Sequence, residues 1–127
     1  MEGAVSSPVP AAGEASRVLY VDDEPSLCRA FARLFREDER FDVRTVSSPE
    51  EAISLMGREA FDVVVSDLRM PGMSGIELLA TARRRMPRAR RLLVSGYADF
   101  ESALDAINEV GVDRLLTKPW TNEELRG

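Results

Sequence analysis

The sequence predicts an α/β domain in which a doubly wound, five-stranded parallel sheet is covered by helices on both faces. From Arg17 onward, short runs rich in β-branched residues alternate with segments of helical period, which is the pattern of such a sheet. The runs are also apolar without alternation, as the VVV at 63–65 shows, and strands that are covered on both faces have this character. The predicted strands are residues 17–21, 42–46, 62–66, 90–94 and 112–116.

Two helix starts and one helix end are predicted here from caps. Ser48 with Glu51 predicts a capping box for the second helix, which is expected to end at Gly57. Ser74 with Glu77 repeats this signal for the third helix. The first helix is predicted from an apolar stripe with spacings of three and four, formed by Leu27, Ala30, Phe31, Leu34 and Phe35.

Two further helices are predicted near the end of the chain. Gly111 is expected to end the fourth helix, and Thr121 with Glu124 to begin a fifth. The fifth helix is truncated, because the chain ends after one or two turns, and we expect the natural protein to continue beyond Gly127. The buried stripe of the fourth helix is expected to consist of Phe100, Ala103, Leu104 and Ile107.

Length and composition favour a single domain. With 127 residues the chain can bury a core without cross-links, and its one cysteine, Cys28, cannot form an internal disulfide. We therefore expect a buried thiol and a cytoplasmic location. Residues 1–16 lack the features of a secretory signal and are expected to form a disordered leader before a domain at 17–127. No run approaches the roughly eighteen apolar residues of a membrane span, so no membrane partner is expected.

The charge of the chain argues against direct nucleic-acid binding by this domain. The formal net charge is −5, whereas affinity for phosphate backbones comes mainly from clustered cations. One local cluster is basic, and we interpret it as a solvated helix end whose cations complement the helix dipole. It consists of Arg83, Arg84, Arg85, Arg88, Arg90 and Arg91.

Polar residues follow four of the predicted strands where each strand ends. Asp22 and Asp23 follow the first strand, Asp67 the third, Ser95 the fourth and Lys118 the fifth. Because the carboxyl ends of parallel strands open onto one crevice, we expect these side chains to meet there. Singly, each has an ordinary explanation as a turn residue, a helix-dipole partner or a solvated charge. Their joint placement favours a functional site.

This set of groups suits a magnesium ion and a phosphoryl group. Mg²⁺ prefers hard oxygen ligands and takes one or two carboxylates together with phosphate oxygens. Asp67 is the predicted nucleophile, since an attacking carboxylate forms an acyl phosphate, and it is expected to be partly exposed. Lys118 would pair with one phosphoryl oxygen and Ser95 would donate to another, while Gly96 lets the loop approach. The sequence therefore predicts a phosphorylation switch.

With these residues in place, the chain resembles the receiver domains of bacterial two-component response regulators, the CheY-like family. The resemblance runs from Arg17 to the end, through VDDEP, SDLRMPGMSG, SGYA and TKPW. It implies a flavodoxin-like (βα)5 fold and phosphotransfer to Asp67 from a sensor histidine kinase or phosphotransfer protein. Such a domain phosphorylates and dephosphorylates itself but is not a turnover enzyme. Asp22, through water, and Asp23 would hold Mg²⁺ with Asp67 and the backbone carbonyl of Arg69.

The resemblance also bears on the switch and its output. Ser95 would move toward the phosphoryl group while an aromatic residue three before the lysine turns inward, but this chain has Leu115 there. The Lys118–Pro119 bond resembles the cis peptide of the family. Arg69 and Tyr97 hold positions that tune aspartyl-phosphate lifetime. The tail ending in the KPW-type motif is similar to receivers that precede larger output modules, among them HD-type cyclic-di-GMP phosphodiesterases and transcriptional activators.

Three other functional hypotheses are possible for a domain with this fold and these residues. A haloacid-dehalogenase phosphatase would carry a second aspartate two residues after the nucleophile, where this chain has Arg69. An electron-transfer flavin domain would need a glycine- and hydroxyl-rich loop after the first strand, and DDEPS would repel the flavin phosphate. A pseudo-receiver that docks without phosphorylation is favoured only by Leu115. The cognate kinase, the signal, the output domain and the oligomeric state are not indicated by the sequence.

Overall fold

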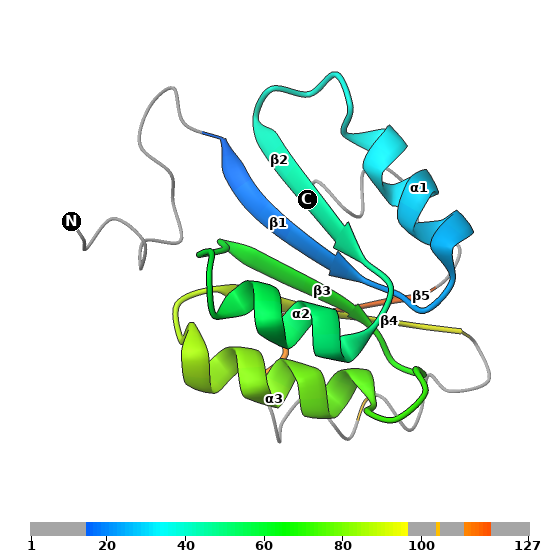
Figure 1. Ribbon diagram of the computed structural model, residues 1–127, viewed down its shortest axis with the longest axis vertical. Helices are drawn as coiled ribbons and strands as arrows, with labels where there is room; N and C mark the ends of the chain where they lie inside the picture. The colour runs from blue at the N-terminus through cyan, green and yellow to red at the C-terminus, as the bar shows by residue number, and fades with distance from the viewer. Residues whose placement is uncertain (1–14, 97–103, 105–110, 118–127) are drawn as a thin grey trace.

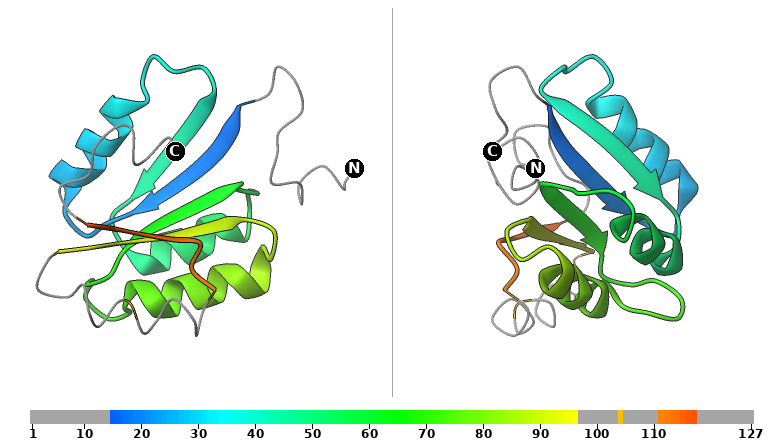
Figure 2. Two further views of the ribbon diagram at one scale, coloured as in Figure 1. Left: turned by 180° about the vertical axis from the view of Figure 1, so that it is seen from behind. Right: turned by 60° about the vertical axis from the view of Figure 1, so that its left-hand side comes forward.

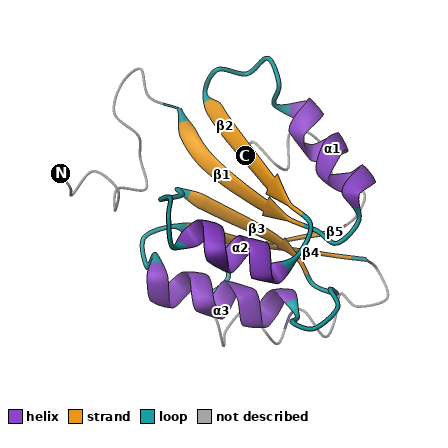
Figure 3. Ribbon diagram, in the orientation of Figure 1, coloured by secondary structure: helices purple, strands orange, loops and turns teal. Residues whose placement is uncertain are grey.

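The computed structural model describes residues 15–96, 104 and 111–117, and the five predicted strands are present in it (Figure 1, Figure 3). Their observed bounds differ from the predicted ones by two residues at most. In chain order the elements are β1 (Ser16–Val21), α1 (Pro25–Leu34), β2 (Phe41–Val46), α2 (Pro49–Met56), β3 (Val63–Asp67), α3 (Gly75–Arg85), β4 (Arg90–Ser95) and β5 (Arg114–Thr117).

The described strands form one parallel sheet in the order β2-β1-β3-β4-β5. This is the flavodoxin-like order of doubly wound folds, in which the chain reverses its direction of winding between β1 and β3. α1 covers one face, and α2 and α3 cover the other (Figure 1, Figure 2). The predicted fold class is confirmed.

Strand β1 contributes to the core on both faces of the sheet. Leu19 and Val21 pack toward α2 and α3, whereas Val18 and Tyr20 pack toward α1, because successive side chains of a strand point to opposite faces. All four side chains are buried. The absence of hydrophobic alternation in the sequence of this strand follows from its cover on both sides.

Of the capping boxes predicted at Ser48 and Ser74, the structure shows the one at Ser74 in full and the one at Ser48 in part. Ser74 and Glu77 form the complete capping box, in which the Ser74 hydroxyl accepts from Glu77 N at 3.2 Å and Ser74 N donates to Glu77 Oε1 at 3.1 Å. The box predicted at Ser48 is only half formed. Glu51 N donates to the Ser48 hydroxyl, but the Glu51 carboxylate accepts from the hydroxyls of Ser48 and Ser47 and not from the backbone.

The interpretation of the arginine cluster as a solvated helix end is wrong for Arg91, which is 8% exposed. Its Nε donates to the carbonyl oxygen of Gly111 at 2.9 Å, and its Nη1 donates to that of Ala89 at 3.0 Å. A guanidinium has five N–H donors, so it can be buried where backbone carbonyls accept from it. Gly111 itself has φ +66°, the left-handed conformation expected of the residue that ends a helix.

The prediction that Leu104 is buried is also wrong, because its side chain is 45% exposed. It belongs to the predicted stripe of the fourth helix, whose other members lie outside the described residues. The start predicted for the fifth helix at Thr121 and Glu124 lies outside them as well. Within the part of the chain that the structure describes, no helix is long and apolar enough to cross a membrane.

Replacing Phe31 with alanine should lower the free energy of unfolding by about 3–5 kcal/mol. Phe31 is 2% exposed, and its ring stacks on that of Tyr20 with centroids 4.1 Å apart. The matched control is Leu104→Ala, which removes an exposed side chain and should change stability by less than about 0.5 kcal/mol. Urea denaturation followed by circular dichroism measures both, and equal effects would contradict the assignment of the core.

Candidate functional site

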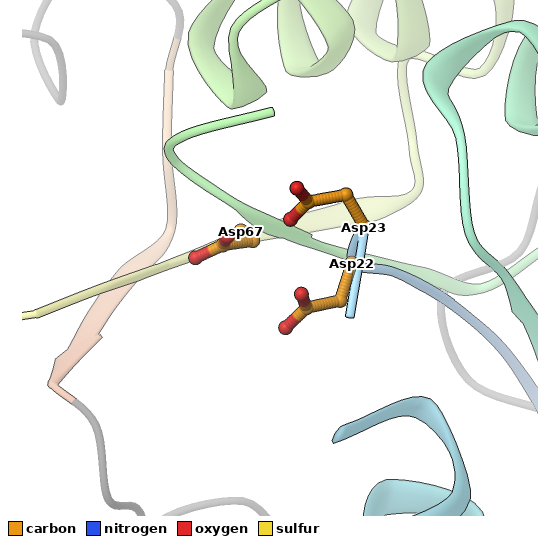
Figure 4. Close-up of side chains that lie close together, drawn as sticks. All are labelled: Asp22, Asp23 and Asp67. Atoms are coloured by element: carbon orange, nitrogen blue, oxygen red, sulfur yellow. The ribbon is translucent and has the colours of Figure 1, made fainter. Parts of the chain in front are cut away.

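Three carboxylates meet where the carboxyl ends of β1 and β3 lie side by side (Figure 4). Asp22 and Asp23 directly follow β1, and Asp67 is the last residue of β3. The two strands are paired in parallel register, with Val21 opposite Ser66. One oxygen from each carboxylate lies within 4.8 Å of the others. The structure thus brings these three predicted residues together at the point where the sheet reverses its winding, which is where ligands bind in such folds.

Asp22 is the most enclosed of the three, with an exposed fraction of 0%. Its Oδ2 accepts from the Tyr20 hydroxyl at 2.7 Å, and its Oδ1 accepts from the backbone N–H of Glu24 at 3.0 Å. Burial, assisted by the hydrogen bond to Asp22 and the charges of Asp22 and Asp67, raises the pKa of Tyr20 far above its ordinary value. The hydroxyl therefore keeps its proton and remains a donor.

Asp67 is more enclosed than the partial exposure predicted from the sequence, because its side chain is 7% exposed. It lies within β3 and not after it, so that β4 flanks it through the pairing of Asp67 with Val94. Its backbone carbonyl accepts from the Ser66 hydroxyl at 3.0 Å. Gly75, the first residue of α3, packs against the same carbonyl. The backbone of the predicted phosphate acceptor is thus held on two sides.

A pocket opens beside these carboxylates and includes further predicted residues. Ser95 is 1% exposed, and its hydroxyl donates to the carbonyl oxygen of Gly96 at 3.2 Å. The Arg69 side chain is exposed at the pocket. Lys118 and Tyr97 lie outside the described residues, as does Pro119. The pocket is lined by Asp23, Glu24, Asp67, Leu68, Arg69, Ser95 and Gly96.

The donor set fits a hard divalent cation. Among the described residues, the cluster that could hold a metal offers three carboxylates and no thiolate or imidazole. Carboxylate oxygens suit Mg²⁺, which also retains water ligands, whereas softer metals select sulfur or nitrogen. Like charges at this separation repel, and a divalent cation relieves that repulsion.

Sequence reasoning missed two groups at this site, the Tyr20 hydroxyl and the Glu24 side chain. Tyr20 lies two residues before Asp22, and the period of a strand places both on the same side of the sheet. That spacing could have indicated that the Tyr20 hydroxyl lies near the Asp22 carboxylate, but a tyrosine in an apolar strand is ordinarily a core residue. Glu24 follows the acidic pair directly and lines the pocket.

Comparison with known proteins identifies the family. The sequence model of the response regulator receiver domain matches residues 18–127. The chain belongs to this family. It is a receiver domain of the two-component, CheY-like type, with the five-stranded parallel sheet described above.

Individual relatives agree with this assignment. The hydrogenase transcriptional regulatory protein HoxA of Cupriavidus necator is 42% identical over 108 residues, which are 85% of this chain and 22% of that protein. The chain thus spans about a quarter or less of the length of HoxA and of the alginate biosynthesis transcriptional regulatory protein AlgB of Pseudomonas syringae pv. tomato.

Solved structures share the fold over most of the chain. A response regulator receiver domain protein from Clostridium thermocellum superposes with a TM-score of 0.79 at 28% identity, covering 87% of each chain. The signal receiver domain of an HD domain-containing protein from Pseudomonas fluorescens Pf-5 gives a TM-score of 0.81 at 28% identity, covering 88% of this chain and 89% of that one.

Leu115, where the family resemblance implies an aromatic residue, packs against the hydrophobic core. It lies on β5 and packs, partly buried, against the core cluster on the α2 and α3 face. Its partner in the register is Leu93, which is fully buried in the same cluster. The position at which the family resemblance implies an aromatic residue is therefore filled by an aliphatic side chain that belongs to the core.

Replacing Gly75 with alanine should destabilise the domain by about 1–3 kcal/mol and displace Asp67. A Cβ atom at residue 75 would lie 2.1 Å from the carbonyl oxygen of Asp67, so the backbone of one or both must shift. In the control Gly57→Ala the nearest atom would be 3.4 Å away, and stability should be unchanged or rise by less than about 1 kcal/mol. Urea denaturation compares the two variants, and a tolerated alanine at 75 would contradict the packing.

The thiol of Cys28 should react slowly in the folded domain. It is 6% exposed, burial is the main cause that raises its pKa to about 11, and its Sγ donates to the Asp22 carbonyl at 3.3 Å. At pH 8 the smaller thiolate fraction alone predicts that Cys28 reacts with a disulfide about 100-fold more slowly than an ordinary thiol does. Absorbance after addition of a chromogenic disulfide measures it, with the urea-unfolded chain as the control. Equal rates in the two states would refute the expectation.

Proposed function

We propose that this receiver domain accepts a phosphoryl group on Asp67 from the phosphohistidine of a sensor histidine kinase or of a phosphotransfer protein. The observation that supports this proposal most strongly is the meeting of Asp22, Asp23 and Asp67 beside an open pocket at the switch point of the sheet. Three like charges gathered at one point disfavour the folded state unless positive charge offsets them. A functional requirement for that charge explains their placement.

The residues of the site have distinct roles in the proposed transfer. A carboxylate oxygen of Asp67 forms a bond to phosphorus as the phosphorus–nitrogen bond of the donor breaks, and the imidazole leaves with the bonding electron pair. Asp22, Asp23, Asp67 and the backbone carbonyl of Arg69 would hold Mg²⁺, and when bound the ion supplies positive charge beside the phosphoryl oxygens. The Lys118 ammonium, as a compact point charge, would pair with one of those oxygens.

Ser95 is proposed to be the residue that responds to phosphorylation. Its hydroxyl donates to the Gly96 carbonyl, so it must leave that acceptor before it can donate to a phosphoryl oxygen. Because Leu115 is aliphatic and packed in the core, the response would proceed without the rotation of an aromatic ring at that position. The domain is accordingly proposed to be a switch that phosphorylates and dephosphorylates itself, not a turnover enzyme.

The output of the switch is proposed to be a larger module that follows this domain. HoxA is a transcriptional regulatory protein, and the structural relative from Pseudomonas fluorescens belongs to an HD domain-containing protein. Both kinds of protein resemble those expected from the KPW-type ending of this sequence. We infer a cytoplasmic location and no direct contact of this domain with nucleic acid, in keeping with its net charge of −5.

Incubation with acetyl phosphate and Mg²⁺ should add one phosphoryl group to the parent chain and none to Asp67→Asn, because only the carboxylate can act as the nucleophile. Intact-mass spectrometry with and without Mg²⁺ measures the addition. The control Asp42→Asn removes a carboxylate that is 54% exposed and paired with Arg17, and it should be modified like the parent. A parent chain that takes up no phosphoryl group would contradict the proposal and favour a docking module that is independent of phosphorylation.

A further inference from the structure

We propose that Tyr20 is a positioning residue of the metal site, whose hydroxyl holds the Asp22 carboxylate in the orientation that binds Mg²⁺. This inference rests on the proposed function, since it assigns a role to a residue behind the same acidic cluster. Tyr20 is not proposed to contact the phosphoryl group or the ion, and it would affect metal binding only through Asp22.

The first support is the way in which the Asp22 carboxylate is held. Its Oδ2 accepts from the Tyr20 hydroxyl at 2.7 Å, a buried contact, and its Oδ1 accepts from the Glu24 backbone N–H at 3.0 Å. Each oxygen thus accepts from a donor, and these two donors come from opposite sides of Asp22 in the chain. Rotation of the carboxylate about its last torsion would break both hydrogen bonds. The side chain is therefore preorganised before any ion arrives.

The second support is the rigidity of the donor itself. The Tyr20 ring is fully buried and stacks on the Phe31 ring of α1, with centroids 4.1 Å apart and planes at 10°. It belongs to the apolar cluster on the α1 face, which includes Phe35 and Val65. The burial and stacking of the ring thus hold the hydroxyl in place beside Asp22.

The third support is the electrostatics of a buried carboxylate. An ionised group taken out of water costs free energy unless hydrogen bonds replace its hydration, and bonds to charged acceptors are about twice as strong as neutral ones. The donors of Tyr20 and Glu24 replace part of that hydration for Asp22.

A purely structural role is the competing explanation, in which the ring fills the core and the hydroxyl takes the nearest acceptor. The two explanations differ in what the hydroxyl does for the metal. Removal of a group that orients a metal ligand typically lowers the affinity for the metal by 10–100-fold. A structural hydroxyl would change only the stability of the fold.

The test is Tyr20→Phe, which keeps the ring stacking and removes only the hydroxyl. Titration of the ¹⁵N-labelled chain with MgCl₂, followed by NMR at the amide of Glu24, gives the dissociation constant for the ion. We expect this constant to rise on the order of 10-fold in the variant. The control Val18→Ala truncates a side chain that is 5% exposed in the same cluster, two residues before Tyr20 in β1. It should lower stability but leave the dissociation constant unchanged.

A second measurement separates binding from chemistry. The rate of phosphorylation by acetyl phosphate at increasing Mg²⁺ should show a half-saturating concentration raised by the same factor, with the maximal rate retained. An unchanged dissociation constant in Tyr20→Phe, or equal changes in both variants, would overturn the inference and leave the proposed function intact. A parent chain whose spectrum does not respond to Mg²⁺ would overturn the inference together with the metal part of the proposed function.

Discussion

The repulsion between Asp22, Asp23 and Asp67 is the constraint around which this edge of the domain is built. Parallel pairing of β1 with β3 brings the three carboxylates together, and one oxygen of each lies within 4.8 Å of the others. Their arrangement is therefore maintained by the surrounding structure and not by attraction among themselves. Donors to Asp22 on one strand, and the close packing of Gly75 behind Asp67 on the other, provide that support.

The strands and the carboxylates could be predicted from the sequence for a common physical reason. Apolar runs mark strands covered on both faces, and parallel topology then fixes where the next polar residue must lie. Details that depend on side-chain conformation could not be predicted. Arg91 could not be distinguished from its exposed neighbours, because its acceptors are backbone carbonyls that leave no mark in the sequence. The exposure of Leu104 was missed because spacing defines a stripe but not its edges.

As a receiver domain, the chain combines an intact acidic cluster with an unusual β5. The acidic residues match the family resemblance residue by residue, while Leu115 departs from it and packs into the core beside Leu93. The proposed acceptor chemistry therefore involves the ends of β1 and β3, whereas the departure from the family resemblance lies on β5, at the far side of the sheet order from β2.

The buried guanidinium of Arg91 gives β5 a fixed end. It binds the carbonyls of Ala89 and Gly111, and the backbones of Arg91 and Asp113 are joined by a further hydrogen bond of 2.7 Å. These contacts lie at the amino ends of β4 and β5, opposite the edge that holds the carboxylates. Thr117, at the opposite end of β5, pairs with Ser95 beside the site. A displacement of β5 that kept the contacts of Arg91 would therefore be largest at Thr117.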